Sequence, residues 1–365
     1  MLNHGTFFLP GPTEVRPEIL QTLTRPMLPH RGAAFEAIYA RCDAGLRTIF
    51  RTSRPVYIAS ASATGLMEGA IRCAPSGAVL SLVNGAFSER FAQVAQSCGR
   101  TVVRDDVALG SHHTPEQVAA LLASSAAKVV TLTHSETSTG AMNDIAAIAR
   151  AVHDAGAVIL VDSVTGVAGA RLERDEWHLD FVFTGSQKAL ALPPGLALGV
   201  ASDAFIAGAA HNVDRGTYFD LVEFEKYAVK NQTPNTPAIS LCYALAEQVE
   251  AIAAEGIEAR WARHLAMQAL TIAWAGHLAT DVNPAFGVLA PASGRSPTVS
   301  CITLPHAIAG TAVAASVAKR GYIIGAGYGP LRDRTIRIGH MGDHTVSGLT
   351  DCLAEVRDVL VSMVG

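Results

Sequence analysis

Charge is scarce in this sequence, and neither sign dominates it. Charged residues make up 16% of the 365 residues, and 28 Lys and Arg against 32 Asp and Glu give a formal net charge of −4 at pH 7. Proteins that bind nucleic acid or a membrane surface usually carry an excess of Lys and Arg. We therefore expect no nucleic-acid groove and no membrane-bound face.

The sequence has no C-x-x-C cysteine pair and no long apolar run, and we expect no targeting segment at its start. No two cysteines form a C-x-x-C pair, so we expect neither a metal site nor a disulfide framework, and a reducing compartment is indicated. The opening residues lack the basic stretch of a secretory signal, and no apolar run reaches membrane-spanning length. We expect a soluble cytoplasmic protein. The six cysteines are Cys42, Cys73, Cys98, Cys242, Cys301 and Cys352.

From about residue 55 to residue 201, short apolar runs alternate with segments of helical spacing. The runs are rich in β-branched residues, as is typical of strands buried on both faces. The alternation predicts an α/β fold with a mainly parallel sheet, which binds ligands beyond the carboxyl ends of its strands. The predicted strands are 56–59, 79–83, 129–132, 158–161, 181–183 and 196–200, and the predicted helices are 65–73, 89–97, 115–124 and 144–155.

The remaining sequence predicts a second, smaller unit. We expect a large domain over 16–254 and a small α+β domain over 255–365, which also includes residues 1–15. Its expected helices are 256–275, 310–320 and 344–363, its expected strands lie near 300–304 and 336–339, and a long helix over 240–255 precedes it.

Two charged residues follow neighbouring predicted strands. Asp162 ends an apolar strand, where a buried carboxylate is costly without a partner. A helix cap or an NTPase-type acid is the alternative, but the chain contains no G-x-x-x-x-G-K-[ST] motif. Lys188 follows the next strand and, taken alone, is equally an ordinary surface lysine. Together they suit pyridoxal phosphate, which needs a lysine for its Schiff base and an acid beside its ring nitrogen.

Two polar or small-residue segments follow other strands. Residues 59–65, Ala-Ser-Ala-Ser-Ala-Thr-Gly, join a strand to a helix, and the free N–H groups and dipole at a helix start bind phosphate. An ordinary tight turn is the alternative. Residues 133–140, Thr-His-Ser-Glu-Thr-Ser-Thr-Gly, carry more hydroxyl groups than a turn requires.

The segments 9–13, 133–140, 161–164 and 185–190 together resemble the class V aminotransferases, pyridoxal phosphate enzymes of fold type I. The resemblance is strongest to the alanine–glyoxylate and serine–pyruvate branch, and Arg337-Ile338-Gly339 extends it over nearly the whole chain. It implies a transaminase that exchanges an amino group between alanine or serine and glyoxylate or pyruvate by a ping-pong mechanism.

The resemblance also implies residue roles. Lys188 would carry the cofactor and move a proton at the substrate α-carbon, and Asp162 would pair with the ring nitrogen. Arg337 would bind the substrate carboxylate, for which a guanidinium fork has the right geometry. Phe87 would stack on the ring, although a core phenylalanine is the alternative. The remaining cofactor residues would be Ser62, Ala63, Thr64 and Gln187 at the phosphate, Thr137 at the ring hydroxyl and Val164 on the other ring face.

Thr236 matches a threonine that, in this family, reaches the phosphate of the neighbouring subunit. The resemblance therefore implies a homodimer with shared active sites. A helix cap between two prolines is the alternative, and one threonine can serve both purposes.

Three alternatives stay open. His30 and Arg31 resemble a segment that binds a substrate phosphate in phosphoserine aminotransferases, and Arg332 and Arg334 would add positive charge. Pyridoxamine–pyruvate transaminases are a further relative. A catalytically silent protein of this fold is the third alternative, although such a protein can dispense with Lys188.

Overall fold

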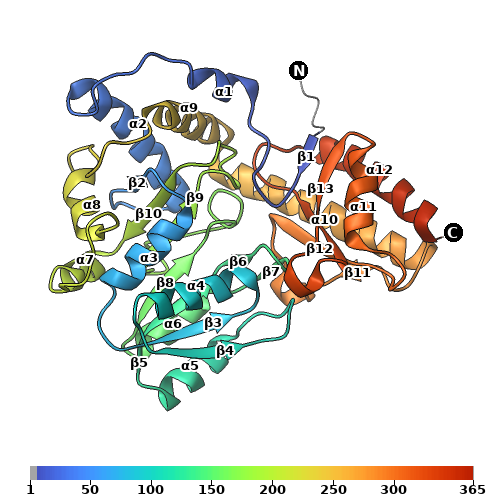
Figure 1. The fold of residues 1–365 in the computed structure, drawn as a ribbon, viewed down its shortest axis with the longest axis horizontal. Coiled ribbons are helices and arrows are strands. Elements are labelled where there is room, and N and C mark those ends of the chain that lie inside the picture. The colour runs from blue at the N-terminus through green and yellow to red at the C-terminus, as the bar shows by residue number, and fades with distance from the viewer. Residues whose placement is uncertain (1–5, 365) are drawn as a thin grey trace.

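The computed structural model describes residues 6–364, which form two large sheets, each with its own buried core, and a small two-stranded sheet (Figure 1). In the larger, seven-stranded sheet, every neighbouring pair that excludes β10 is parallel, and β10 is antiparallel to both of its neighbours. The fold is therefore α/β with a mainly parallel sheet, as the sequence predicts. In spatial order the strands are β2 (Tyr57–Ala59), β10 (Ala197–Ala201), β9 (Phe181–Gly185), β8 (Val158–Asp162), β5 (Ala127–Thr133), β3 (Ala78–Val83) and β4 (Val102–Asp106).

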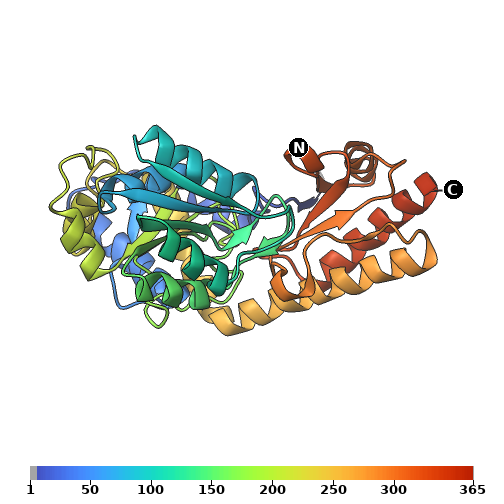
Figure 2. The same cartoon turned by 90° about the horizontal axis from the view of Figure 1, so that it is seen from below.

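Helices lie on both sides of these strands (Figure 2). Their starts follow local sequence signals: the Thr114 hydroxyl accepts a hydrogen bond from Gln117 N, and the Asp144 carboxylate accepts one from Ala147 N. The helices are α1 (Pro17–Thr22), α2 (Ala33–Phe50), α3 (Ala63–Cys73), α4 (Ala86–Ser97), α5 (Pro115–Ser124), α6 (Ile145–Asp154), α7 (Asp203–Ala209), α8 (Leu221–Ala228) and α9 (Ile239–Glu255), and a short hairpin joins β6 (Ser135–Glu136) to β7 (Ala141–Met142).

The smaller sheet has five strands and takes its edge strand from the start of the chain. There β1 (Thr6–Phe8) pairs in parallel with β13 (Tyr322–Ala326), so the N-terminal segment lies beside the C-terminal sheet. The other elements are β14 (Thr335–Gly339), β12 (Val299–Thr303), β11 (Gly287–Val288), α10 (Ile257–Asp281), α11 (Gly310–Ala318), α12 (Val346–Val364), η1 (Ala292–Gly294) and η2 (Gly329–Leu331).

One helix links the two cores. Gly256, with φ +84°, separates α9 from α10. From there α10 contributes Trp261 to the larger core and Trp274 to the smaller one, and Figure 2 shows it running along both sheets. The expected boundary between residues 254 and 255 falls beside this turn, and the division into two domains stays a prediction. Residues 1–5 and 365 of the expected small domain lie outside the described residues.

The elements that were not predicted from the sequence include α2, β4 and β13. The helix α2 buries Phe35, Ile38, Tyr39 and Cys42 at helical spacing, so its signal was present. The edge strand β4 carries three charged residues, which hide a strand pattern, and β13 lies among glycines.

Two negative findings apply to residues 6–364. No helix in this range is both long enough and apolar enough to cross a bilayer. The same range holds no group of three or more His, Cys, Asp or Glu side chains arranged for a metal ion.

Candidate active site

Three neighbouring strands of the larger sheet end at one edge. Thr133 of β5 lies opposite Asp162 of β8, which lies opposite Phe183 of β9. Because these strands are parallel, the segments that follow them emerge side by side. This register brings Lys188, three residues after β9, to the edge where Asp162 ends its strand.

A cavity of about 230 Å³ lies at this edge. It is lined by every residue that the resemblance assigns to the cofactor within one subunit, so segments more than a hundred residues apart converge on it. The lining residues are Ser62, Ala63, Thr64, Met67, Phe87, Arg90, Thr133, Ser135, Thr137, Asp162, Val164, Thr165, Gln187 and Lys188.

Lys188 is held at both its backbone and its side chain. The Thr13 hydroxyl donates a hydrogen bond to the Lys188 carbonyl at 3.0 Å, and the Lys188 amine donates to the Pro10 carbonyl. Gly11 has φ +118°, a conformation that favours glycine, and a Cβ atom there would lie 2.5 Å from the Lys188 amine and would displace the lysine. Burial, and then the charge of Arg337, lowers the pKa of Lys188 from 10.5 to about 8. A neutral amine is therefore accessible near neutral pH.

Asp162 also lines the cavity, where it supplies an acidic group. Its carboxylate accepts a hydrogen bond from Val164 N at 2.9 Å and is 3% exposed. Burial, together with the charge of Glu136, raises the pKa of Asp162 to about 7, against the opposing effects of Val164 N and Lys188. A buried carboxylate of this kind is suited to hold a cationic group placed next to it.

The remaining walls offer groups for a phosphate and for a polar ring. Ser62 is the N-cap of α3 and makes no capping bond through its side chain within residues 6–364, so this helix start, which lines the cavity, has no side-chain cap on its N–H groups. Within residues 6–364, the Thr133 hydroxyl is buried without a hydrogen-bond partner. Thr137 is bound through its hydroxyl to Thr165. An amine, a carboxylate, a helix start and an orphaned hydroxyl fit pyridoxal phosphate, because each has a counterpart on that molecule.

Arg337 lies beside the cavity, on β14 of the smaller sheet. Its Nε donates to the Ala326 carbonyl at 2.9 Å and its Nη1 to the Thr137 carbonyl at 3.3 Å. No carboxylate of the described chain forms an ion pair with this half-buried guanidinium, and burial lowers its pKa. A cation placed so, with a free edge, is suited to bind a carboxylate from solution.

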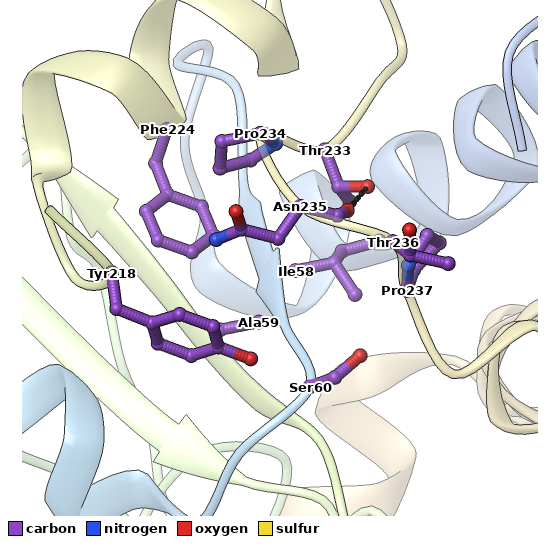
Figure 3. A pocket seen from close by; sticks show the side chains of 10 residues that line it. All are labelled: Ile58, Ala59, Ser60, Tyr218, Phe224, Thr233, Pro234, Asn235, Thr236 and Pro237. Atoms are coloured by element: carbon purple, nitrogen blue, oxygen red, sulfur yellow. Dashed lines mark hydrogen bonds between the residues drawn. The ribbon is translucent and has the colours of Figure 1, made fainter.

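Three predicted site residues lie elsewhere in the chain. Thr236 lies in the loop before α9 and lines the small pocket of Figure 3, which Ser60, Tyr218 and Thr233 also line. Arg31 donates to the carbonyls of Thr233 and Pro234, at 2.6 and 3.0 Å, so it belongs to the same loop cluster. His30 precedes it and does not line the Lys188 cavity.

A family model described as aminotransferase class V matches residues 63–328. The chain belongs to the class V aminotransferase family. An uncharacterized aminotransferase of Methanocaldococcus jannaschii is 34% identical to this class V aminotransferase over 92% of the chain and 87% of the relative. The L-aspartate–glyoxylate aminotransferase of Paracoccus denitrificans is 31% identical over 97% and 89%. The serine–glyoxylate aminotransferase of Methylorubrum extorquens is 28% identical over 96% and 89%.

A solved structure has the same fold as this class V aminotransferase. The crystal structure of an alanine–glyoxylate aminotransferase from Nostoc sp. superposes with a TM-score of 0.91 at 26% identity, covering 98% of this chain and 95% of the other. The family match and these aminotransferase relatives support a transaminase.

Sequence analysis overlooked one buried carboxylate of this aminotransferase. Glu136 is fully buried and accepts hydrogen bonds from the backbone N–H groups of Phe87, Ser88 and Ser138 and from both serine hydroxyls. It thereby fixes the start of α4, which carries Phe87 into the cavity. The glutamate stands inside the quoted segment 133–140, but nothing in that local pattern shows that it caps a helix from another part of the chain.

Proposed function

We propose that this protein is a pyridoxal phosphate-dependent aminotransferase that moves an amino group from alanine or serine to glyoxylate or pyruvate. The observation that carries the proposal is that the Lys188 amine, the Asp162 carboxylate and the start of α3 line one cavity. The alanine–glyoxylate, serine–glyoxylate and aspartate–glyoxylate relatives differ in their donors and have glyoxylate in common. Glyoxylate is therefore the better supported acceptor.

Residues of one subunit would hold most of the cofactor. The N–H groups at the start of α3, with Gln187, would bind the phosphate, and Asp162 would keep the ring nitrogen protonated. Bound pyridoxal phosphate supplies an electron sink that stabilises negative charge at the substrate α-carbon. Phe87 and Val164 would enclose the ring, and Thr137 would exchange its bond to Thr165 for one to the ring hydroxyl.

Lys188 and Arg337 would act on the substrate. Arg337 would bind the α-carboxylate through the guanidinium edge that the chain leaves free, which orients the α-carbon toward the Lys188 amine. Because its pKa is lowered to about 8, Lys188 would accept the α-proton as a base and then return it as an acid. The donor leaves as its 2-oxo acid and the acceptor leaves as an amino acid, so no external oxidant or reductant is needed.

We further propose that two copies of the chain share their active sites. Thr236, His30 and Arg31 lie outside the Lys188 cavity of their own chain and close to one another, as expected of residues that serve a partner. Large apolar side chains are exposed on the neighbouring segments, among them Met27 at 64% and Tyr218 at 51%. Such exposure supports a second copy as the occupant of this face.

The visible spectrum of the purified protein, recorded while amino acids are added singly, tests the proposal. Loss of the absorbance of the lysine-bound cofactor with alanine or serine, but not with phosphoserine, is the expected result. Bleaching by phosphoserine alone would make the protein a phosphoserine aminotransferase with His30 and Arg31 as ligands. The variant Lys188→Ala is expected to show neither this absorbance nor turnover, and full activity in it would overturn the mechanism.

A further inference from the structure

Tyr328 lies between two residues of the candidate site, one on helix α4 and the other on strand β14. Its ring centroid is 5.8 Å from that of Phe87, with the two planes inclined at 36°, and the guanidinium carbon of Arg337 lies 5.4 Å from the ring. Phe87 starts α4 beside the larger sheet, whereas Arg337 belongs to the smaller one. Tyr328 therefore bridges the start of α4 and the strand that carries Arg337.

The loop that carries Tyr328 is tightly constrained. The Arg337 Nε donates to the Ala326 carbonyl, which fixes the loop to the arginine two residues before the tyrosine. At Gly327 a Cβ atom would lie 1.9 Å from the Leu331 carbonyl oxygen, so a glycine is required for the loop to fold back on itself. The turn that carries the Tyr328 ring is therefore constrained, although the ring itself is 39% exposed.

The other contacts of Phe87 complete an arc of four groups. The Lys188 amine lies 5.8 Å from the Phe87 ring centroid, so amine, Phe87, Tyr328 and Arg337 follow one another. A substrate whose carboxylate binds Arg337 and whose amino group reaches Lys188 must lie along this arc. The two aromatic rings then face the substrate carbon atoms between its charged ends, and because their centroids are only 5.8 Å apart, a longer side chain cannot pass between the two rings without moving one of them.

We propose that Tyr328 determines which amino acids this enzyme accepts, as an aromatic wall that admits small side chains and excludes longer unbranched ones. The inference rests on the proposed function and names the substrate class of the same site. The Tyr328 ring also orients the Arg337 guanidinium by a cation–π contact, so it constrains the carboxylate end of the substrate as well.

The test compares donors that differ only in length. The ratio of kcat/KM for 2-aminopentanoate to that for alanine is measured in the wild type, Tyr328→Ala and Tyr328→Phe, with pyridoxal phosphate and glyoxylate present. One methylene in an apolar pocket changes kcat/KM by roughly 10- to 200-fold, so removal of the wall is expected to raise the ratio by at least about 10-fold. Tyr328→Phe keeps the ring and is expected to keep the wild-type ratio. Val361→Ala, on an exposed position of α12, is the distant control.

A second readout does not depend on turnover. The rise in Tm caused by pyruvate and by 2-oxopentanoate is measured for the same variants without an amino donor. The wild type is expected to respond to pyruvate alone, and Tyr328→Ala to both acids.

An unchanged ratio and an unchanged pattern of Tm shifts in Tyr328→Ala would overturn the inference. A ratio raised as much in Tyr328→Phe as in Tyr328→Ala would also overturn it, because the hydroxyl and not the ring would then set selectivity. If the wild type transfers no amino group from any donor, the proposed function is wrong, and the Tm shifts still decide whether Tyr328 limits ligand length.

Discussion

The guanidinium of Arg260 lies 2.9 Å from the carboxylate of Asp343 and joins the linking helix α10 to the segment that follows β14. The Arg260 side chain is only 2% exposed, and its Nη2 also donates to the Ala189 carbonyl at 2.7 Å. Ala189 is the residue next to Lys188. The ion pair therefore ties the junction of the two sheets to the lysine at the active site.

Asp343→Ala is expected to lower the free energy of unfolding by roughly 2–3 kcal/mol, because within residues 6–364 it removes one of the two carboxylates that pair with the buried Arg260 guanidinium, and it also removes the partner of Arg16. Chemical denaturation of the cofactor-free protein measures this loss. Arg320→Ala breaks a pair whose members are 40% and 39% exposed and is the matched control, with an expected change below about 0.5 kcal/mol. Equal effects of the two variants would contradict the structural role of Asp343.

Lys188 is expected to make the stability of the cofactor-free protein depend on pH. Burial lowers its pKa from 10.5 to about 8, so between these values the unfolded chain holds a proton that the folded protein has released. The contribution of this group to the free energy of unfolding therefore rises with pH from about 8 to 10.5 and is lowest below pH 8. Lys188→Met removes the penalty, so it is expected to be more stable than wild type at pH 7 by at most about 3 kcal/mol.

Denaturation at pH 7 and at pH 10 checks this expectation in both proteins. The difference between Lys188→Met and wild type should shrink at the higher pH. A difference that is the same at both pH values would mean that the lysine titrates as it does in water.

Arg337→Lys keeps the positive charge but loses the planar fork and the anchoring bond to Ala326. We expect kcat/KM to fall roughly 10- to 100-fold for both amino acid and 2-oxo acid, as one charge-assisted hydrogen bond is lost. Steady-state kinetics with each substrate varied in turn measures the change. Arg332→Lys, on the nearby exposed turn, is expected to leave alanine turnover unchanged, whereas unchanged kcat/KM in Arg337→Lys would remove the arginine from the substrate site.

Thr236→Ala is expected to weaken the binding of the cofactor in the active site of the partner subunit. If the residue acts across the interface, mixed dimers of Thr236→Ala and Lys188→Ala chains contain one complete site, which combines Lys188 of one chain with Thr236 of the other. Co-refolding the two variants should then restore the absorbance of lysine-bound cofactor and part of the turnover. Restoration of neither would place the action of Thr236 within its own chain, and tight cofactor binding by a monomer would contradict the shared site.

Local patterns accounted for most of the larger sheet and for the chemistry at its edge. Asp162 and Lys188 were found because the first ends an apolar strand and the second comes three residues after the next one, and parallel strands bring their carboxyl ends to one edge. Hydrophobic periodicity is a property of neighbouring residues, so it is readable without the fold. The antiparallel direction of β10 was not readable, since its apolar run is the same in either direction.

The sequence by itself determined the alternation of strands and helices, the family and the residues at the strand ends. Tertiary structure alone decided that Tyr328 touches Phe87, that Glu136 caps α4 and that Arg337 reaches the Thr137 carbonyl. It also placed His30 and Arg31 beside Thr236 and away from Lys188 in the same chain. Each of these depends on how two distant segments pack, and packing is set by the shape of the whole core, which no short stretch of sequence encodes.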